Sequence, residues 1–140
     1  MNNNKQEENK NLIAVYGSLR RSLGNHRLIQ HSKYLGTFNT EPIFSLYSLG
    51  GFPGLKENGN TSVVMEVYEV DDQTAKSVDG LEGYSPNRVP TFYDKIQIQT
   101  PYGQAGVYIY VSDIPENRKV ESGDWVSFLG KKHEYRSIMA

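Results

Sequence analysis

The sequence LIAVYGSL, residues 12–19, decides the fold of this chain. Its first five residues are apolar or aromatic, which is typical of a buried strand, and Gly17-Ser18 ends the run as a tight turn. A glycine at a strand end lets successive backbone N–H groups converge, because no Cβ lies in the way. The stretch therefore predicts either an anion-binding turn, suited to a carboxylate or a phosphate, or a glycine that only reverses the chain.

Outward from this strand, the chain shows further strand patterns and two helical ones. Residues 62–70 carry apolar side chains on both faces, which predicts a strand buried on both sides. The other expected elements are a helix over residues 25–34, a short strand among irregular loops within residues 38–59, a helix from Asp71-Asp72 toward Gly83, a hairpin of residues 92–100 and 107–111, and a last strand near Trp125. Strands outnumber helices, so we expect an α+β domain with a curved mixed or antiparallel sheet and few helices.

Length and composition narrow the class of protein. The chain has 140 residues and a formal net charge of −1, so we expect one domain and no overall field that attracts nucleic acid or an anionic membrane. It contains no cysteine, which removes disulfides, thiolate nucleophiles and Cys-ligated metals, and it has no long apolar run that could span a membrane. We expect a disordered tail over residues 1–11, a single domain over residues 12–135, and a location in the cytoplasm.

Glu82 is the candidate for proton transfer that spacing favours most. Ala75, Val78 and Glu82 stand at i, i+3 and i+7, so a helix that buries the first two turns the carboxylate toward the same interior. Burial and the negative end of the helix dipole both raise the pKa of a carboxyl toward neutrality, where it can take and return a proton. The competing interpretation is that Gly80 ends the helix early and leaves Glu82 solvated or paired with a nearby cation.

Other polar clusters give weaker signals. His26 and His31 are five residues apart and do not share a helix face, so no metal site is predicted. Arg20, Arg21 and Arg27 follow the first strand and form a basic patch that could bind phosphate or an acidic substrate. Such a cluster is more often a solvated face.

Four short motifs follow one another along the chain: Val15-Tyr16-Gly17-Ser18-Leu19, Gly24-Asn25-His26, Val78-Asp79-Gly80-Leu81-Glu82-Gly83-Tyr84 and Ser122-Gly123-Asp124-Trp125. In this order they resemble the γ-glutamylcyclotransferase-like superfamily, and most of all its γ-glutamylamine cyclotransferase branch with the plant avirulence-induced-gene-like proteins. The similarity runs from about Leu12 to Trp125. It implies a small, closed or nearly closed β-barrel with a mixed sheet and a few flanking helices.

The resemblance also implies a reaction. A γ-glutamyl amide is cleaved when its own α-amine attacks the γ-carbonyl, which releases 5-oxoproline and a free amine with no cofactor and no metal ion. By analogy, Glu82 takes the proton from the amine and gives it to the leaving group. The backbone N–H groups of Gly17, Ser18 and Leu19 would hold the polar head of the substrate and help with the developing negative charge.

Two tyrosines complete the implied substrate-binding site. Tyr16 would line the pocket, and Tyr93 matches the first residue of a Tyr-x-Arg pair that the family often carries on the strand after the glutamate. Here the pair reads Tyr93-Asp94-Lys95. Lysine keeps the charge but loses the planar fork of arginine, so any bidentate contact is lost and the substrate preference is expected to differ.

Two other functions stay open on the sequence. The same pocket would suit a non-catalytic protein that senses a γ-glutamyl or amino-acid metabolite or a partner protein. The patch of Arg20, Arg21 and Arg27 would suit a module that binds phosphate or nucleic acid. The leading expectation is an enzyme with a small-molecule γ-glutamyl substrate, with no nucleic-acid or membrane partner, that is a monomer or a weak homodimer. The sequence does not identify the amine that leaves.

Overall fold

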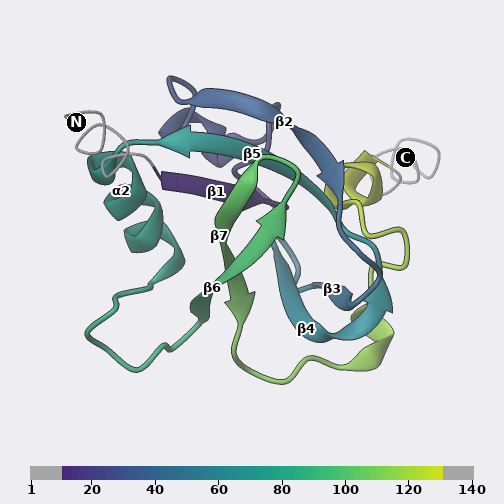
Figure 1. Ribbon diagram of the computed structural model, residues 1–140. Helices are drawn as coiled ribbons and strands as arrows, with labels where there is room; N and C mark the ends of the chain where they lie inside the picture. Colours follow the sequence, from purple (N-terminus) through teal and green to yellow (C-terminus); the bar gives the residue numbers. More distant parts are fainter. Residues whose placement is uncertain (1–10, 131–140) are drawn as a thin grey trace, which may run out of the picture.

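A computed structural model describes residues 11–130 as a five-stranded mixed sheet, a separate two-stranded hairpin and few helices (Figure 1). The predicted tail, apart from Asn11, and the predicted end of the domain at residue 135 lie outside the described residues. The strands are β1 (Asn11–Val15), β2 (Lys33–Asn39), β3 (Phe44–Ser48), β4 (Pro53–Thr61), β5 (Val64–Val70), β6 (Tyr93–Thr100) and β7 (Gly103–Tyr110). The helices are η1 (Gly24–Leu28), α2 (Asp72–Glu82) and η2 (Glu116–Arg118), and residues 125–130 form a further helical segment.

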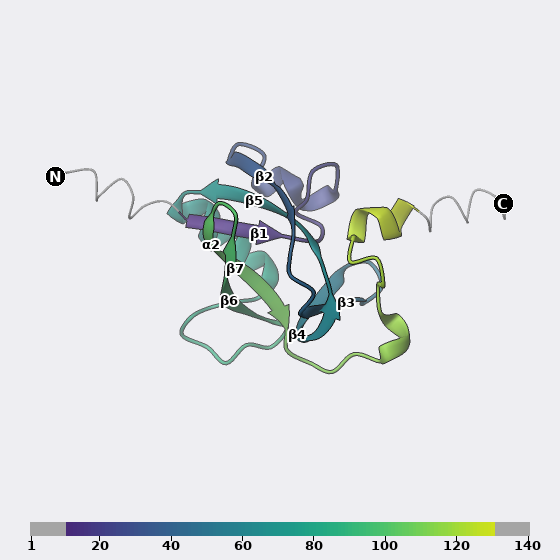
Figure 2. The same ribbon diagram turned by 45° about the vertical axis from the view of Figure 1, so that its right-hand side comes forward.

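Strand β1 lies at the centre of the larger sheet, whose order is β2-β5-β1-β7-β6. It runs antiparallel to β5 and parallel to β7. Successive side chains of a strand point to opposite faces, so Ala14 joins one hydrophobic cluster while Ile13 and Val15 join the other. Both faces are covered, one by α2 and the other by the β3–β4 hairpin (Figures 1 and 2). This double burial explains why β1 reads as a continuous apolar run.

The predicted α+β class with a mixed sheet and few helices is confirmed. The sheet is not closed into a barrel, because β2 and β6 are its two edge strands and β3 and β4 form a separate two-stranded sheet. The predicted hairpin is also present, since β6 and β7 pair in full register from Tyr93 opposite Tyr110 to Thr100 opposite Gly103.

The predicted helix over residues 25–34 is wrong. Only the short 3₁₀ helix η1 forms there, and the chain then enters β2, which pairs antiparallel with β5. Gly36 has a φ of 156° at a β-bulge, and a Cβ there would lie 1.9 Å from the hydroxyl of Tyr102. The local helical spacing is thus overridden by strand pairing with distant residues.

Two further expectations near the sheet need correction. The region of residues 38–59 is more regular than predicted, because it holds the β3–β4 hairpin with a bulge between Phe44 and Ser45. The predicted last strand near Trp125 is wrong, since residues 125–130 are helical. The Oδ1 atom of Asp124 accepts from the N–H of Ser127 at 3.2 Å, which is the hydrogen bond of a helix N-cap. Trp125 is buried in the core as a helical residue.

Helix α2 forms as predicted and ends where the site begins. The carboxylate of Asp71 caps its start by accepting from the N–H of Thr74 at 2.7 Å. Gly83 closes its end in the left-handed conformation, at a φ of 71°. Ala75 and Val78 are buried against the sheet, so the helix continues through Gly80 and carries Glu82 in its last turn.

Candidate active site

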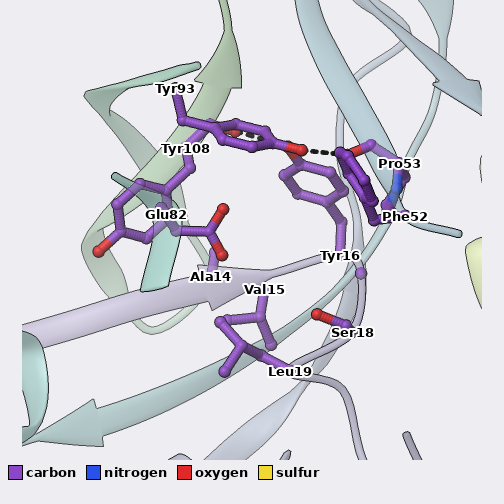
Figure 3. Close-up of a pocket in the computed structure, with 11 residues that line it drawn as sticks. Ala14, Val15, Tyr16, Ser18, Leu19, Phe52, Pro53, Glu82, Tyr93 and Tyr108 are labelled. Atoms are coloured by element: carbon purple, nitrogen blue, oxygen red, sulfur yellow. Dashed lines mark hydrogen bonds between the residues drawn. The ribbon is translucent and has the colours of Figure 1, made fainter. Parts of the chain in front are cut away.

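A cavity lies where the end of β1, the end of α2 and the starts of β4 and β6 meet (Figure 3). Six residues were predicted for the site from the sequence, and all six line this cavity: Tyr16, Gly17, Ser18, Leu19, Glu82 and Tyr93. The remaining lining residues are Ala14, Val15, Phe52, Pro53 and Tyr108. The structure therefore brings together a glycine turn, one carboxylate and three tyrosines from segments far apart in the sequence.

The glycine turn after β1, residues Gly17, Ser18 and Leu19, lines this cavity. The carbonyl of Gly17 accepts from the N–H of Arg20 at 2.9 Å, which closes the turn. In the described part of the chain, no protein acceptor is bonded to the N–H groups of Gly17, Ser18 or Leu19. Convergent N–H groups of this kind suit an anion or a developing oxyanion.

Residues of the second motif hold this turn in place. Asn25 binds Ser18 twice, through its N–H to the carbonyl at 3.1 Å and through its amide Nδ2 to Oγ at 2.8 Å. The Nδ1 atom of His26 lies 2.9 Å from the carbonyl oxygen of Leu19. The side chains of Asn25 and His26 thus position the turn.

Glu82 directs its carboxylate into the cavity, toward the side that Tyr16 and Ser18 line (Figure 3). The side chain is half-buried, and burial raises its pKa to about 7. Among the described residues it has no cationic partner, since Lys95 binds Asp79 and the Nη2 atom of Arg88 donates to the carbonyl of Gly83. A carboxyl group with this pKa can exchange a proton near neutral pH.

The three tyrosines of the cavity are fixed, neutral hydrogen-bond donors. Tyr16 donates to the carbonyl of Tyr108 at 2.7 Å, and Tyr93 donates to the carbonyl of Pro53 at 2.7 Å. The hydroxyl of Tyr108 donates to the carboxylate of Asp79. Burial raises the pKa of all three phenols above the usual range, so none of them is a base at neutral pH. Glu82 is left as the group of this cavity that titrates near pH 7.

Lys95 lies behind the cavity rather than in its lining. Its Nζ is 3.0 Å from Oδ1 of Asp79 and 5.4 Å from the centre of the Tyr108 ring. It therefore fixes the carboxylate that receives the Tyr108 hydroxyl, one turn of α2 before Glu82. Lys95, which stands at the arginine position of the expected Tyr-x-Arg pair, therefore supports the site without lining the cavity.

The basic patch suggested by the sequence does not exist as a cluster of three exposed cations. Arg20 is buried, with Nε 2.9 Å from Glu66 and Nη1 2.9 Å from Asp124. Its neighbour Arg21 stacks over the ring of Tyr34 at 4.2 Å. Only Arg21 and Arg27 remain at the surface, which weakens the nucleic-acid interpretation.

Two classes of site are not found in the part of the chain that the structure covers. No group of three or more His, Asp or Glu side chains within residues 11–130 is placed to hold a metal ion. Over the same range, no helix is long and apolar enough to cross a bilayer.

The family described as gamma-glutamyl cyclotransferase, AIG2-like matches residues 13–127 of this chain. The chain belongs to this family. A relative in Vibrio cholerae is 44% identical over 116 residues, which is 83% of this chain and 96% of the relative. The Escherichia coli protein YtfP, named a gamma-glutamylcyclotransferase family protein, is 39% identical over 81% of this chain and 95% of its own length. The crystal structure of an uncharacterized Pyrococcus horikoshii protein superposes with a TM-score of 0.74 at 26% identity, covering 89% of this chain and 97% of that one.

Two residues that line the cavity, Phe52 and Pro53, were not expected from the sequence. They lie in a stretch whose composition suggested irregular loops, and only the β3–β4 hairpin carries them to the end of β1. One signal points to Pro53, since a Cβ on Gly17 would lie 2.7 Å from its Cγ. The glycine of the motif is therefore needed for the approach of Pro53 as well as for the turn.

Gly17→Ala is expected to destabilise this gamma-glutamyl cyclotransferase fold by about 1–3 kcal/mol, because the rigid Pro53 ring must move away from the new methyl group. The matched control is Gly24→Ala, since a Cβ at Gly24 meets nothing within 4 Å. Urea unfolding of both variants measures the difference. Equal midpoints for the two variants would contradict the close packing of Gly17 on Pro53.

Proposed function

We propose that this protein is a γ-glutamyl cyclotransferase that cleaves a small γ-glutamyl amide into 5-oxoproline and an amine. The observation that carries the proposal is the half-buried carboxylate of Glu82, with a pKa of about 7, which faces a turn of unbonded backbone N–H groups. This reaction requires proton transfer and stabilisation of an oxyanion, and these groups can supply both.

The substrate supplies the nucleophile, its own α-amine, so the protein does not have to provide one. Holding the γ-glutamyl chain folded brings its α-amine to the γ-carbonyl, and such preorganisation accounts for a large part of an intramolecular barrier. Glu82 takes a proton from the α-ammonium group and passes a proton to the departing nitrogen. The N–H groups of Gly17, Ser18 and Leu19 receive the negative charge that develops on the γ-carbonyl oxygen.

The protons and bonds of this step balance. The α-nitrogen begins with three hydrogens, forms the bond to the γ-carbon and keeps one hydrogen in the lactam. The bond from the γ-carbon to the amide nitrogen breaks, and that nitrogen takes up the two protons and leaves as an ammonium ion. No cofactor, oxidant or water molecule enters this balance.

The proposal also includes a small-molecule substrate, a location in the cytoplasm, and a protein that is a monomer or a weak homodimer.

The experiment that tests the proposal is 5-oxoproline release from a panel of γ-glutamyl amines and peptides, measured between pH 5 and pH 9. Because the base must be a carboxylate, kcat/KM is expected to fall about tenfold per pH unit below the pKa of Glu82, which is about 7. A profile that stays flat from pH 5 to pH 8 would rule out this group as the base. Binding of γ-glutamyl compounds without release of 5-oxoproline would favour the metabolite-sensing alternative.

A further inference from the structure

The cavity opens into a wider groove that the reaction leaves unassigned. The groove shares Ser18, Phe52, Glu82 and Tyr93 with the cavity, so the two spaces are continuous. The cavity has a volume of about 40 Å³, whereas the groove has about 570 Å³. The carboxylate of Glu82 lies at the junction. A γ-glutamyl head bound at the glycine turn therefore has its amide nitrogen, and everything attached to that nitrogen, directed toward the groove.

The wall of this groove is built from large apolar side chains that face solvent. Phe52 is 48% exposed, Leu81 is 43% exposed and Phe92 is 56% exposed. They come from three separate segments, the loop before β4, the last turn of α2 and the loop before β6. Exposed apolar side chains that gather around one groove mark a site for a ligand or partner, since single exposed apolar residues are scattered on ordinary surfaces.

The charged residues of the groove indicate whether a charged or an uncharged amine binds there. Among its lining residues within the described chain, Glu82 is the one charged group, and the reaction uses it for proton transfer. Arg88 lies next to the lining, since its Nη2 donates to the carbonyl of Gly83, a residue of the groove, at 3.4 Å. A leaving group with a second ammonium would find no further carboxylate among these lining residues. Burying an unpaired charge in the groove costs free energy, whereas burying an apolar chain against its apolar wall is favourable.

We propose that the groove binds the leaving group of the substrate and selects an uncharged amine with an apolar chain or ring over a diamine or lysine-like amine. This assignment rests on the proposed cyclotransferase function and adds the class of its leaving group. Phe52, Leu81 and Phe92 determine specificity by contact with that chain, while Glu82 protonates its nitrogen.

Two substrates of equal length test the assignment. γ-Glutamylpentylamide and γ-glutamyl-4-aminobutylamide differ only in a terminal methyl group against a terminal ammonium. The pentylamide is expected to have a kcat/KM at least about tenfold higher, since one apolar contact in a pocket discriminates by about this factor and an unpaired cation adds to it. 5-Oxoproline release is the measured quantity for both.

Leu81→Glu places a carboxylate on the apolar wall and is expected to lower the preference for the pentylamide about tenfold or more. The ratio of the two kcat/KM values is the readout, because a second carboxylate beside Glu82 also changes the absolute rate. The matched control is Ile43→Glu, which adds the same charge at a residue that is 54% exposed and lines neither cavity nor groove. Phe92→Ser serves as a second variant and is expected to slow the pentylamide alone.

The outcomes separate the two proposals. Turnover of the aminobutylamide at an equal or higher kcat/KM would overturn the leaving-group assignment and keep the cyclotransferase function. An unchanged ratio in both Leu81→Glu and Phe92→Ser would overturn it as well. No 5-oxoproline from any amide of the panel would overturn the cyclotransferase function, and the leaving-group assignment with it.

Discussion

Glu82→Gln is expected to lower 5-oxoproline release by a factor on the order of 10²–10⁴, the usual contribution of general acid and base catalysis. Glutamine keeps the shape of the side chain and can still lie in the cavity, but it cannot accept a proton from the α-ammonium group. Because the glycine turn is untouched, KM is expected to change much less than kcat. Steady-state kinetics with one γ-glutamyl amide at pH 8 measures both quantities.

The same substitution is expected to stabilise the protein at high pH. The folded-state pKa of Glu82 is about 7, above its ordinary value of 4.5, so the folded state binds more protons than the unfolded state between these values. Stability from this group is therefore present below pH 4.5 and is lost as the pH rises through 7. Burying the charge costs about 3 kcal/mol at pH 8, and Glu82→Gln removes that cost.

Urea unfolding at two pH values tests whether Glu82→Gln, which is expected to lose activity, gains stability at high pH. The free energy of unfolding of Glu82→Gln is expected to exceed that of the wild type at pH 8, with the difference vanishing near pH 4. Glu57→Gln is a suitable control, because Glu57 is an exposed carboxylate outside the active-site cavity. A loss of stability at pH 8 would mean that the carboxylate is held by a favourable contact, and near-normal turnover would mean that another group is the base.

The half of the candidate site that β1 and α2 form was predictable because its signals are local. The spacing of Ala75, Val78 and Glu82 places all three on one helical face, whatever surrounds the helix. The apolar run before Gly17 is equally local, since β1 is covered on both faces and needs no polar residue. Local patterns of this kind thus predicted the face on which the carboxylate lies and the place where β1 ends.

The remainder of the site depends on contacts between distant segments, and no local pattern reports them. Pro53 reaches Gly17 only through the β3–β4 hairpin, in a stretch that composition assigned to loops. A last strand was expected near Trp125, after Gly123-Asp124, but the cap by Asp124 begins a helix there. Arg20 looked like a surface cation, because its buried partner Glu66 is 46 residues away.

Arg20→Ala is expected to destabilise the fold by about 3–5 kcal/mol, the usual effect of removing one partner of a buried ion pair. The side chains of Arg20 and Glu66 are only 10% and 5% exposed, and their Nε to Oε2 distance is 2.9 Å. After the substitution, Glu66 keeps hydrogen bonds from the N–H of Arg21 and the hydroxyl of Tyr68, but no cation balances its charge. Total stabilities of 5–15 kcal/mol are typical, so a large share of the stability would be lost.

The adjacent arginine supplies a matched control. Arg21→Ala removes a cation of the same type, and its contact is an exposed stacking on Tyr34, which is worth about 0.5–1 kcal/mol. The N–H of Arg21 still donates to Glu66 in that variant, since the backbone is unchanged. Urea unfolding of the two variants at one pH gives the comparison, and equal losses of stability would contradict the buried ion pair.

A double variant tests whether the loss of stability in Arg20→Ala comes from the carboxylate of Glu66, which is left buried without a cation. If the cost of Arg20→Ala comes from leaving Glu66 buried without a cation, then Arg20→Met combined with Glu66→Leu is expected to be more stable than Arg20→Ala alone, because no buried charge remains. If the double variant is the less stable of the two, the unpaired charge of Glu66 is not the cause of the loss, because both variants also lack the bond from Arg20 Nη1 to Oδ1 of Asp124, which caps the helical segment at residues 125–130. Turnover by a folded double variant then shows whether the glycine turn needs that link to keep its N–H groups aimed at the substrate.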